Sequence, residues 1–163
     1  MTSRTTFAAV ALVAIALTAG TAQAASTRAE YVAQADPICL SVQGPVDASL
    51  ARYIKAKRKH APLGPAKARL LRSWSKLYGR VTTSLRKLTP APGDEATIAS
   101  WLKARGVVLK DLAAAGKAYA ESEAKLAKRI TLRGDAAIIR SNAAVSGFGF
   151  QNCASDGDTL WSF

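Results

Sequence analysis

The stretch LLRSWSKLYGRVTTSLRKL, residues 70–88, shows most directly how this chain folds. Its large apolar residues recur every three to four positions, at Leu70, Trp74, Leu77, Val81, Leu85 and Leu88. A spacing near 3.5 residues is typical of a helix that buries one side in a bundle. We therefore predict a helix from about Pro65 to Leu88 with its apolar side in the core.

The preceding region predicts another long helix, which starts after Thr27. The Thr27 hydroxyl and the Glu30 carboxylate match a capping box, in which both side chains bond backbone N–H groups at a helix start. The expected inward side consists of Tyr31, Ala35, Ile38, Val42, Val46, Leu50 and Tyr53 or Ile54. Asp36-Pro37 fits a second helix start and Gly44-Pro45 a kink or break, so this element is bent or divided.

Two loops rich in proline and glycine divide the rest of the chain, at residues 57–65 and 89–95. The third helix is expected to extend to about Ile130, with an inward side of Ile98, Trp101 or Leu102, Val108 or Leu109, Leu112, Gly116, Tyr119 and Leu126. A last turn is predicted at residues 133–135, with Gly134 in a left-handed conformation and Asp135 as a cap. The fourth helix then carries inward Ile138, Ile139, Asn142, Val145, Gly149 and Phe150, ahead of Cys153.

The first two dozen residues have the features of a secretory signal peptide. Arg4 precedes an uncharged apolar run from Phe7 to Ala19, and Ala22-Gln23-Ala24 is the small-x-small pattern of a cleavage site. The apolar run is shorter than the roughly twenty residues that span a bilayer. We expect residues 1–24 to be cleaved, residues 25–153 to form one helical domain and residues 154–163 to form an acidic and aromatic tail. An uncleaved membrane anchor is the alternative.

The two cysteines are expected to pair within the chain, because an exported protein meets an oxidising compartment. Free buried thiols and an intermolecular bridge are the alternatives. Four helices with short connections favour an all-α, antiparallel up-down-up-down bundle. In that topology Cys39, early in the first helix, and Cys153, at the end of the fourth, lie at the same pole. One disulfide would then close the bundle, with a stabilisation of roughly 4–5 kcal/mol from chain entropy.

Three short motifs resemble a group of small exported helical proteins from actinobacteria. They are YVAQADPIC at residues 31–39, PGDEATIASWL at 92–102 and FGFQNC at 148–153. The resemblance implies export, a helical fold and pairing of Cys39 with Cys153. It implies no activity, cofactor or catalytic residue.

Residues that could carry catalysis or hold a cofactor are scarce. The only histidine, His60, stands in the basic loop KRKHAP, among cations that do not suit a catalytic base oriented by a third group. One histidine and a paired set of cysteines do not supply the ligands of a zinc site. We therefore expect no catalytic residue, metal or cofactor, and a protein that is not an enzyme.

The formal net charge of +12 is unevenly distributed along the chain. Residues 25–89 hold thirteen Lys or Arg and three acids, whereas residues 90–163 hold nine and eight. Helical spacing predicts one basic face on the first two helices, made of Arg52, Lys55, Lys57, Arg58, Lys59, Arg69, Arg72, Lys76, Arg80 and Lys87. Such a face suits an anionic lipid surface or wall polymer, and the competing interpretation is an ordinary solvated surface.

No specific nucleic acid is expected as a partner, because Trp74 and Tyr78 belong to the apolar side and are not available to stack on bases. We thus expect an exported, non-enzymatic bundle that associates electrostatically with the anionic cell envelope and has no membrane-spanning segment in its mature part. One alternative is a module that binds a small apolar ligand in space left by Gly106, Gly116 and the alanines. Another is an enzyme of an unfamiliar type. The oligomeric state is left open.

Overall fold

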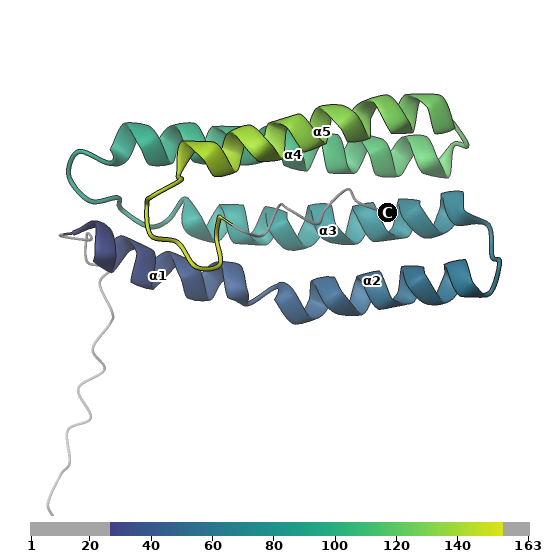
Figure 1. The fold of residues 1–163 in the computed structure, drawn as a ribbon, viewed down its shortest axis with the longest axis horizontal. Helices are drawn as coiled ribbons and strands as arrows, with labels where there is room; N and C mark the ends of the chain where they lie inside the picture. The colour runs from purple at the N-terminus through teal and green to yellow at the C-terminus, as the bar shows by residue number, and fades with distance from the viewer. Residues whose placement is uncertain (1–26, 155–163) are drawn as a thin grey trace, which may run out of the picture.

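The computed structural model describes residues 27–154 as an all-helical bundle, which confirms the predicted fold class. The expected signal peptide and nearly all of the expected tail lie outside these residues. The helices are α1 (Arg28–Leu40), α2 (Gln43–Arg58), α3 (Leu63–Leu85), α4 (Glu95–Ala120) and α5 (Ala124–Ala144). As Figure 1 shows, α1 and α2 follow each other end to end and together form one arm of a four-helix arrangement.

Interactions between residues close in the sequence explain where the arm begins and where its helix is interrupted. Thr27 and Glu30 form the predicted capping box, with both reciprocal bonds present. The helix continues through Pro37 and stops at Leu40, so the break lies at Ser41 and Val42, ahead of Pro45. A proline has no N–H for the carbonyl four residues earlier, and its ring crowds that carbonyl. For Pro45 that carbonyl belongs to Ser41, which explains why the arm is divided there.

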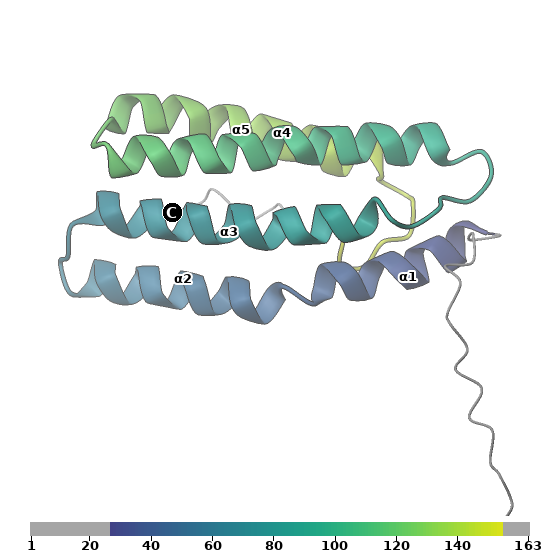
Figure 2. The ribbon, with the colours of Figure 1, turned by 180° about the vertical axis from the view of Figure 1, so that it is seen from behind.

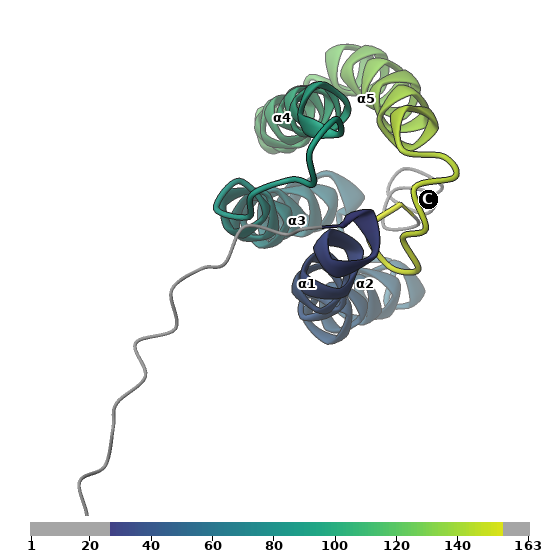
Figure 3. The same cartoon turned by 90° about the vertical axis from the view of Figure 1, so that its left-hand side faces the viewer.

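The arm, α3, α4 and α5 run in alternating directions and pack in chain order. The arm packs against α3, α3 against α4 and α4 against α5. Figure 2 shows the same order from behind, with α3 between the arm and α4. In the end-on view of Figure 3, residues 145–154 leave α5 and cross to α1. This crossing segment therefore connects the last helix to the first.

The crossing segment is held by a disulfide and by a buried carboxylate. Cys39 of α1 pairs with Cys153 at a Cα–Cα distance of 5.2 Å, which confirms the predicted bridge. The Asp36 carboxylate, one turn earlier, accepts hydrogen bonds from the backbone N–H groups of Gln151 (2.8 Å), Asn152 (3.0 Å) and Cys153 (3.1 Å). From α4, the Arg105 guanidinium donates to the Cys153 carbonyl at 3.3 Å. The segment is thus attached to both α1 and α4.

Two phenylalanines of the crossing segment pack into the core together. Their rings stack with centroids 5.2 Å apart; Phe148 also meets the edge of Tyr31, and Phe150 stacks on Trp101. Phe150, predicted to face inward, is half-buried, and Phe148 is the more buried of the two. Helical geometry would have separated the rings, but the helix ends at Ala144 and positive φ angles at Gly147 (75°) and Gly149 (100°) turn the chain.

The predicted boundary between the third and fourth helices is wrong. α4 ends at Ala120, the turn occupies residues 121–123, and Gly134 lies buried in the middle of α5. The left-handed position of the turn is Ser122, with φ of 62°, a conformation for which glycine is the usual residue. The prediction placed the turn at Gly134 because it relied on this usual preference for glycine.

Three residues predicted to face inward, Leu126, Ile139 and Gly149, are exposed. Leu126 is 38% exposed and Ile139 is 69% exposed. The core is otherwise as the periodicity predicts, with Trp74, Leu85, Ile98, Trp101 and Leu112 fully buried. Among residues 27–154, no helix has the length and apolar character needed to cross a membrane.

Replacement of Asp36 should destabilise the fold. We expect Asp36→Ala to lower the free energy of unfolding by about 2–4 kcal/mol, because three backbone N–H groups lose a charged acceptor. Asp36→Asn keeps one acceptor oxygen and should lose less. Denaturant titration of the oxidised protein measures both, with the exposed Asp47→Ala as the control. Equal stability of the Asp36→Ala and Asp47→Ala variants would contradict this role.

The Tyr31 hydroxyl gives a pH-dependent prediction. Burial raises the pKa of this phenol to about 12, and within residues 27–154 its oxygen has no hydrogen-bond partner. The folded state therefore holds the Tyr31 proton more tightly than the unfolded chain, whose phenol has a pKa near 10. The resulting stability, up to about 2–3 kcal/mol, is present below pH 10 and is lost as the pH rises through 12.

We expect Tyr31→Phe to remove that part of the alkaline loss while changing stability at pH 7 by only about 1 kcal/mol or less. Urea unfolding of both proteins at several values between pH 8 and 11.5 measures the difference. Parallel stability curves for the two proteins across this range would show that Tyr31 ionises in the folded protein as it does in solution.

Candidate basic interface

All ten cations predicted for the basic face are exposed, and they come from two neighbouring helices and the ends of these helices. Four lie on α2 (Arg52, Lys55, Lys57, Arg58), with Lys59 directly after its end. Four lie on α3 (Arg69, Arg72, Lys76, Arg80), and Lys87 follows two residues after this helix. Helices α2 and α3 are packed side by side, so the two sets share one region of the molecule.

Three cations of α3 form a continuous stripe. At about 100° per residue, Arg69, Lys76 and Arg80 lie within about 40° of one another around the helix axis. The buried side of α3, which includes Leu70, Trp74 and Leu77, lies elsewhere on the helix. The stripe therefore points away from the core over some three turns.

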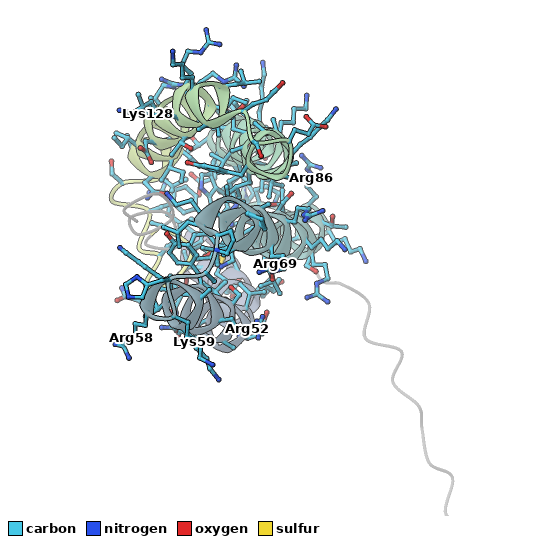
Figure 4. All side chains as sticks on the ribbon, turned by 90° about the vertical axis from the view of Figure 1, so that its right-hand side faces the viewer. Arg52, Arg58, Lys59, Arg69, Arg86 and Lys128 are labelled. Atoms are coloured by element: carbon cyan, nitrogen blue, oxygen red, sulfur yellow. A yellow bond between two sulfur atoms is a disulfide. The ribbon has the colours of Figure 1, made fainter. Side chains whose placement is uncertain are left out.

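Arg52 of α2 adjoins this stripe across the groove between the two helices. A hollow of about 440 Å³ is lined by Arg52 and Arg69, and its wall includes the hydroxyl side chains Ser49 and Ser73. Figure 4 shows Arg52 and Arg69 on neighbouring helices, on the same side of the α2–α3 pair. Ser49 is fixed in place because it accepts a 2.6 Å hydrogen bond from the Trp74 indole. Two guanidinium groups and two hydroxyl side chains thus line one recess.

A separate hollow lies nearer the other pole of the arm. This second hollow, of about 280 Å³, lies between the α1–α2 junction and α3 and is lined by Arg80 together with Ser41 and Ser84. Arg80 also borders an open depression on α3 that Lys76 and Thr83 line. We call Arg52, Arg69, Lys76 and Arg80 the basic groove.

The remaining predicted cations surround the basic groove without extending it. Arg72 lies on the flank of α3 against α4, since its Cγ would be 3.3 Å from a Cβ added at Gly116. Arg58 and Lys59 point away from Arg52 around the end of α2 in Figure 4, so the cations of this helix end face several directions. The structure therefore reduces the predicted ten-residue face to a groove of four cations with six others near it.

The positive charge of this region is not balanced by neighbouring acids. Within residues 27–154, none of the ten cations forms a salt bridge. Three of the acids are buried and used elsewhere: Asp94 binds Arg28, Asp111 binds Arg133, and Asp36 binds the crossing segment. The Arg28 hydrogen bonds hold the pKa of Asp94 below its usual value. Within the described residues, the four cations of the groove therefore carry charges that no salt bridge neutralises.

Other residues singled out by the sequence have ordinary surroundings. His60 is exposed in the α2–α3 loop with a positive φ of 53°. Among the described residues, no group of three His, Cys, Asp or Glu side chains lies close enough to hold a metal ion.

Of the two glycines proposed to leave space between helices, Gly116 permits close packing instead. A Cβ at Gly116 would lie 3.3–3.4 Å from three atoms of α3, so the helices touch there. A Cβ at Gly106 would lie 3.7 Å from the Arg86 guanidinium.

The sequence did not reveal the role of Asp36. It was assigned to a local helix cap beside Pro37, whereas its carboxylate binds backbone more than a hundred residues away. The expected Cys39–Cys153 disulfide was the only signal in the sequence for this role of Asp36. A carboxylate one turn from a bridged cysteine lies close to the backbone around the other cysteine.

Comparison with known proteins identified no similar protein. No protein-family model, curated protein or solved structure matches this chain.

Proposed function

We propose that this protein is exported and associates, without catalysing a reaction, with anionic components of the cell envelope through the basic groove. The observation that carries the proposal is the approach of Arg52 and Arg69 from two helices to one recess lined by hydroxyl side chains. Guanidinium groups bind phosphate oxygens through paired N–H donors. The Ser49 hydroxyl already donates to the Val46 carbonyl, so the donors of the recess are those of the two arginines and Ser73. Phosphate is therefore the best-fitting chemical group.

A polymer of phosphates suits the groove better than one isolated phosphate. The stripe of Arg69, Lys76 and Arg80 extends the positive charge along α3, and exposed cations attract polyanions through the release of counterions. Trp74 and Tyr78 are buried, which argues against the stacking contacts that read single-stranded nucleic acids. The groove thus favours binding to charge along a backbone without recognition of bases.

Export is supported by the pattern of residues 1–24 and is compatible with the disulfide. The non-enzymatic part of the proposal is supported by the exposure of His60 among cations, which suits a solvated side chain better than a catalytic base.

A soluble phosphate polymer without an apolar phase tests the groove directly. We expect the oxidised mature protein to bind inorganic polyphosphate at about 50 mM salt and to release it past a few tenths molar, because salt screens exposed charges. The double variant Arg52→Gln/Arg69→Gln should bind about tenfold more weakly or worse. Isothermal titration calorimetry at several salt concentrations measures both effects.

The matched control is Lys103→Gln/Lys110→Gln, which removes two exposed cations of α4 and changes the net charge equally. The control should lose much less affinity than the groove variant. Equal losses would show that only net charge matters, and an affinity independent of salt would exclude the electrostatic mechanism; either result contradicts the proposal.

A further inference from the structure

The outward side of α5 combines exposed apolar residues with cations. Leu132 is 60% exposed and Ile139 is 69% exposed, the two largest values among the exposed large hydrophobic residues of the described chain. Four exposed cations occupy the same helix at Lys125, Lys128, Arg129 and Arg140. We call these six residues the α5 outer face.

The six residues form one coherent surface. Leu132 and Ile139 are seven positions apart and so lie about 20° from each other around the axis. By the same geometry Lys128 lies on one side of this apolar pair, and Arg129 and Arg140 lie on the other. The result is an apolar centre with cations on both sides, the pattern of a helix that lies in a membrane interface.

The cations of this surface are not the ones that the buried acids neutralise. Asp94 and Asp111 are buried in ion pairs with Arg28 and Arg133, and Arg133 is a cation of α5 outside this surface. Asp135 is the acid within α5, and it is half-buried; burial raises the pKa of its carboxyl group. Within residues 27–154 the four cations of the α5 outer face form no salt bridge.

We propose that the α5 outer face docks onto the surface of an anionic lipid bilayer. The helix would lie parallel to the membrane plane, with Leu132 and Ile139 inserted at the headgroup boundary and the cations against anionic headgroups. In this position the two apolar side chains leave water, and the cations lie next to negatively charged headgroups.

Two other occupants fit the surface less well. A second copy of the chain would bring the cations of two α5 helices together, which is unfavourable for like charges. A soluble polyanion would satisfy the cations but would leave Leu132 and Ile139 in water. The bilayer alone offers an apolar phase next to negative charge.

This surface is separate from the basic groove and does not depend on it. Helix α5 and the arm lie at opposite sides of the bundle in Figures 1 and 3, and Figure 4 labels Lys128 far from Arg52 and Arg58. A protein bound to a membrane through α5 would leave Arg52 exposed for a second anionic partner.

Vesicle binding tests the proposal with the whole oxidised mature protein. We expect binding to phosphatidylcholine vesicles that contain phosphatidylglycerol and weak binding to phosphatidylcholine alone. The variant Leu132→Ser/Ile139→Ser should reduce the partition coefficient about tenfold or more at unchanged net charge. Because both residues are exposed, the fold should be retained, which circular dichroism and thermal unfolding check. The control Leu40→Ser/Val107→Ser alters two exposed apolar residues outside α5 and should bind as the wild type does.

A second measurement locates the membrane contact. With Cys39 and Cys153 bridged, Ile139→Cys supplies the single thiol for an environment-sensitive dye. Its emission should shift to the blue on anionic vesicles, and the same dye at Leu40→Cys should shift little. An unchanged partition coefficient for Leu132→Ser/Ile139→Ser, a dye at position 139 that stays in water, or protein dimers in the absence of lipid that this variant abolishes would overturn the proposal.

The two proposals can fail separately. Loss of vesicle binding in the Arg52→Gln/Arg69→Gln variant, with Leu132→Ser/Ile139→Ser unaffected, would move the lipid contact to the basic groove and would overturn only the role of α5. Failure of polyphosphate binding with intact vesicle binding would overturn only the role of the groove.

Discussion

Three consecutive backbone N–H groups, those of residues 151–153, converge on the carboxylate of Asp36, and the closure of the bundle depends on this contact. The crossing segment is not helical, so its buried N–H groups need acceptors that its own backbone does not supply. Asp36 supplies them at the place where Cys153 must lie to reach Cys39. With the segment in position, Phe148 and Phe150 cover Tyr31 and Trp101 and complete the core at that pole.

Local sequence patterns predict much of this structure, whereas contacts between residues far apart in the sequence could not be predicted from them. The spacing of Leu70, Trp74 and Leu77 fixes an apolar side of α3 before any partner is known. The helix break before Pro45 is likewise a local effect of a missing N–H group. The pairing of the only two cysteines indicated which ends meet. By contrast, the sequence around Asp36 suggests a helix cap, because nothing nearby reveals that its carboxylate binds backbone far along the chain. The turn after α4 escaped prediction because Ser122, rather than a glycine, adopts the left-handed conformation.

The closed bundle presents two cationic surfaces of different character. The basic groove is formed where α2 packs beside α3, so Arg52 and Arg69 from separate helices face one recess. The α5 outer face arises within a single helix and contains an apolar centre. Chain charge counts identified the first surface and concealed the second, because acids of residues 90–163 that lie outside α5, such as Glu95 of α4, offset the cations of α5 in the count. We propose that the two surfaces together suit a protein placed between an anionic membrane and an anionic polymer.

Amide hydrogen exchange of the oxidised protein at residues 151–153 measures whether Asp36 holds the crossing segment in place. These three N–H groups should exchange slowly, with protection comparable to that of the α1 amides around Cys39, because a buried carboxylate binds all three. Exchange at the rate of an unstructured peptide, while the helices remain protected, would contradict this role of Asp36. In that case the disulfide alone would connect the last helix to the first.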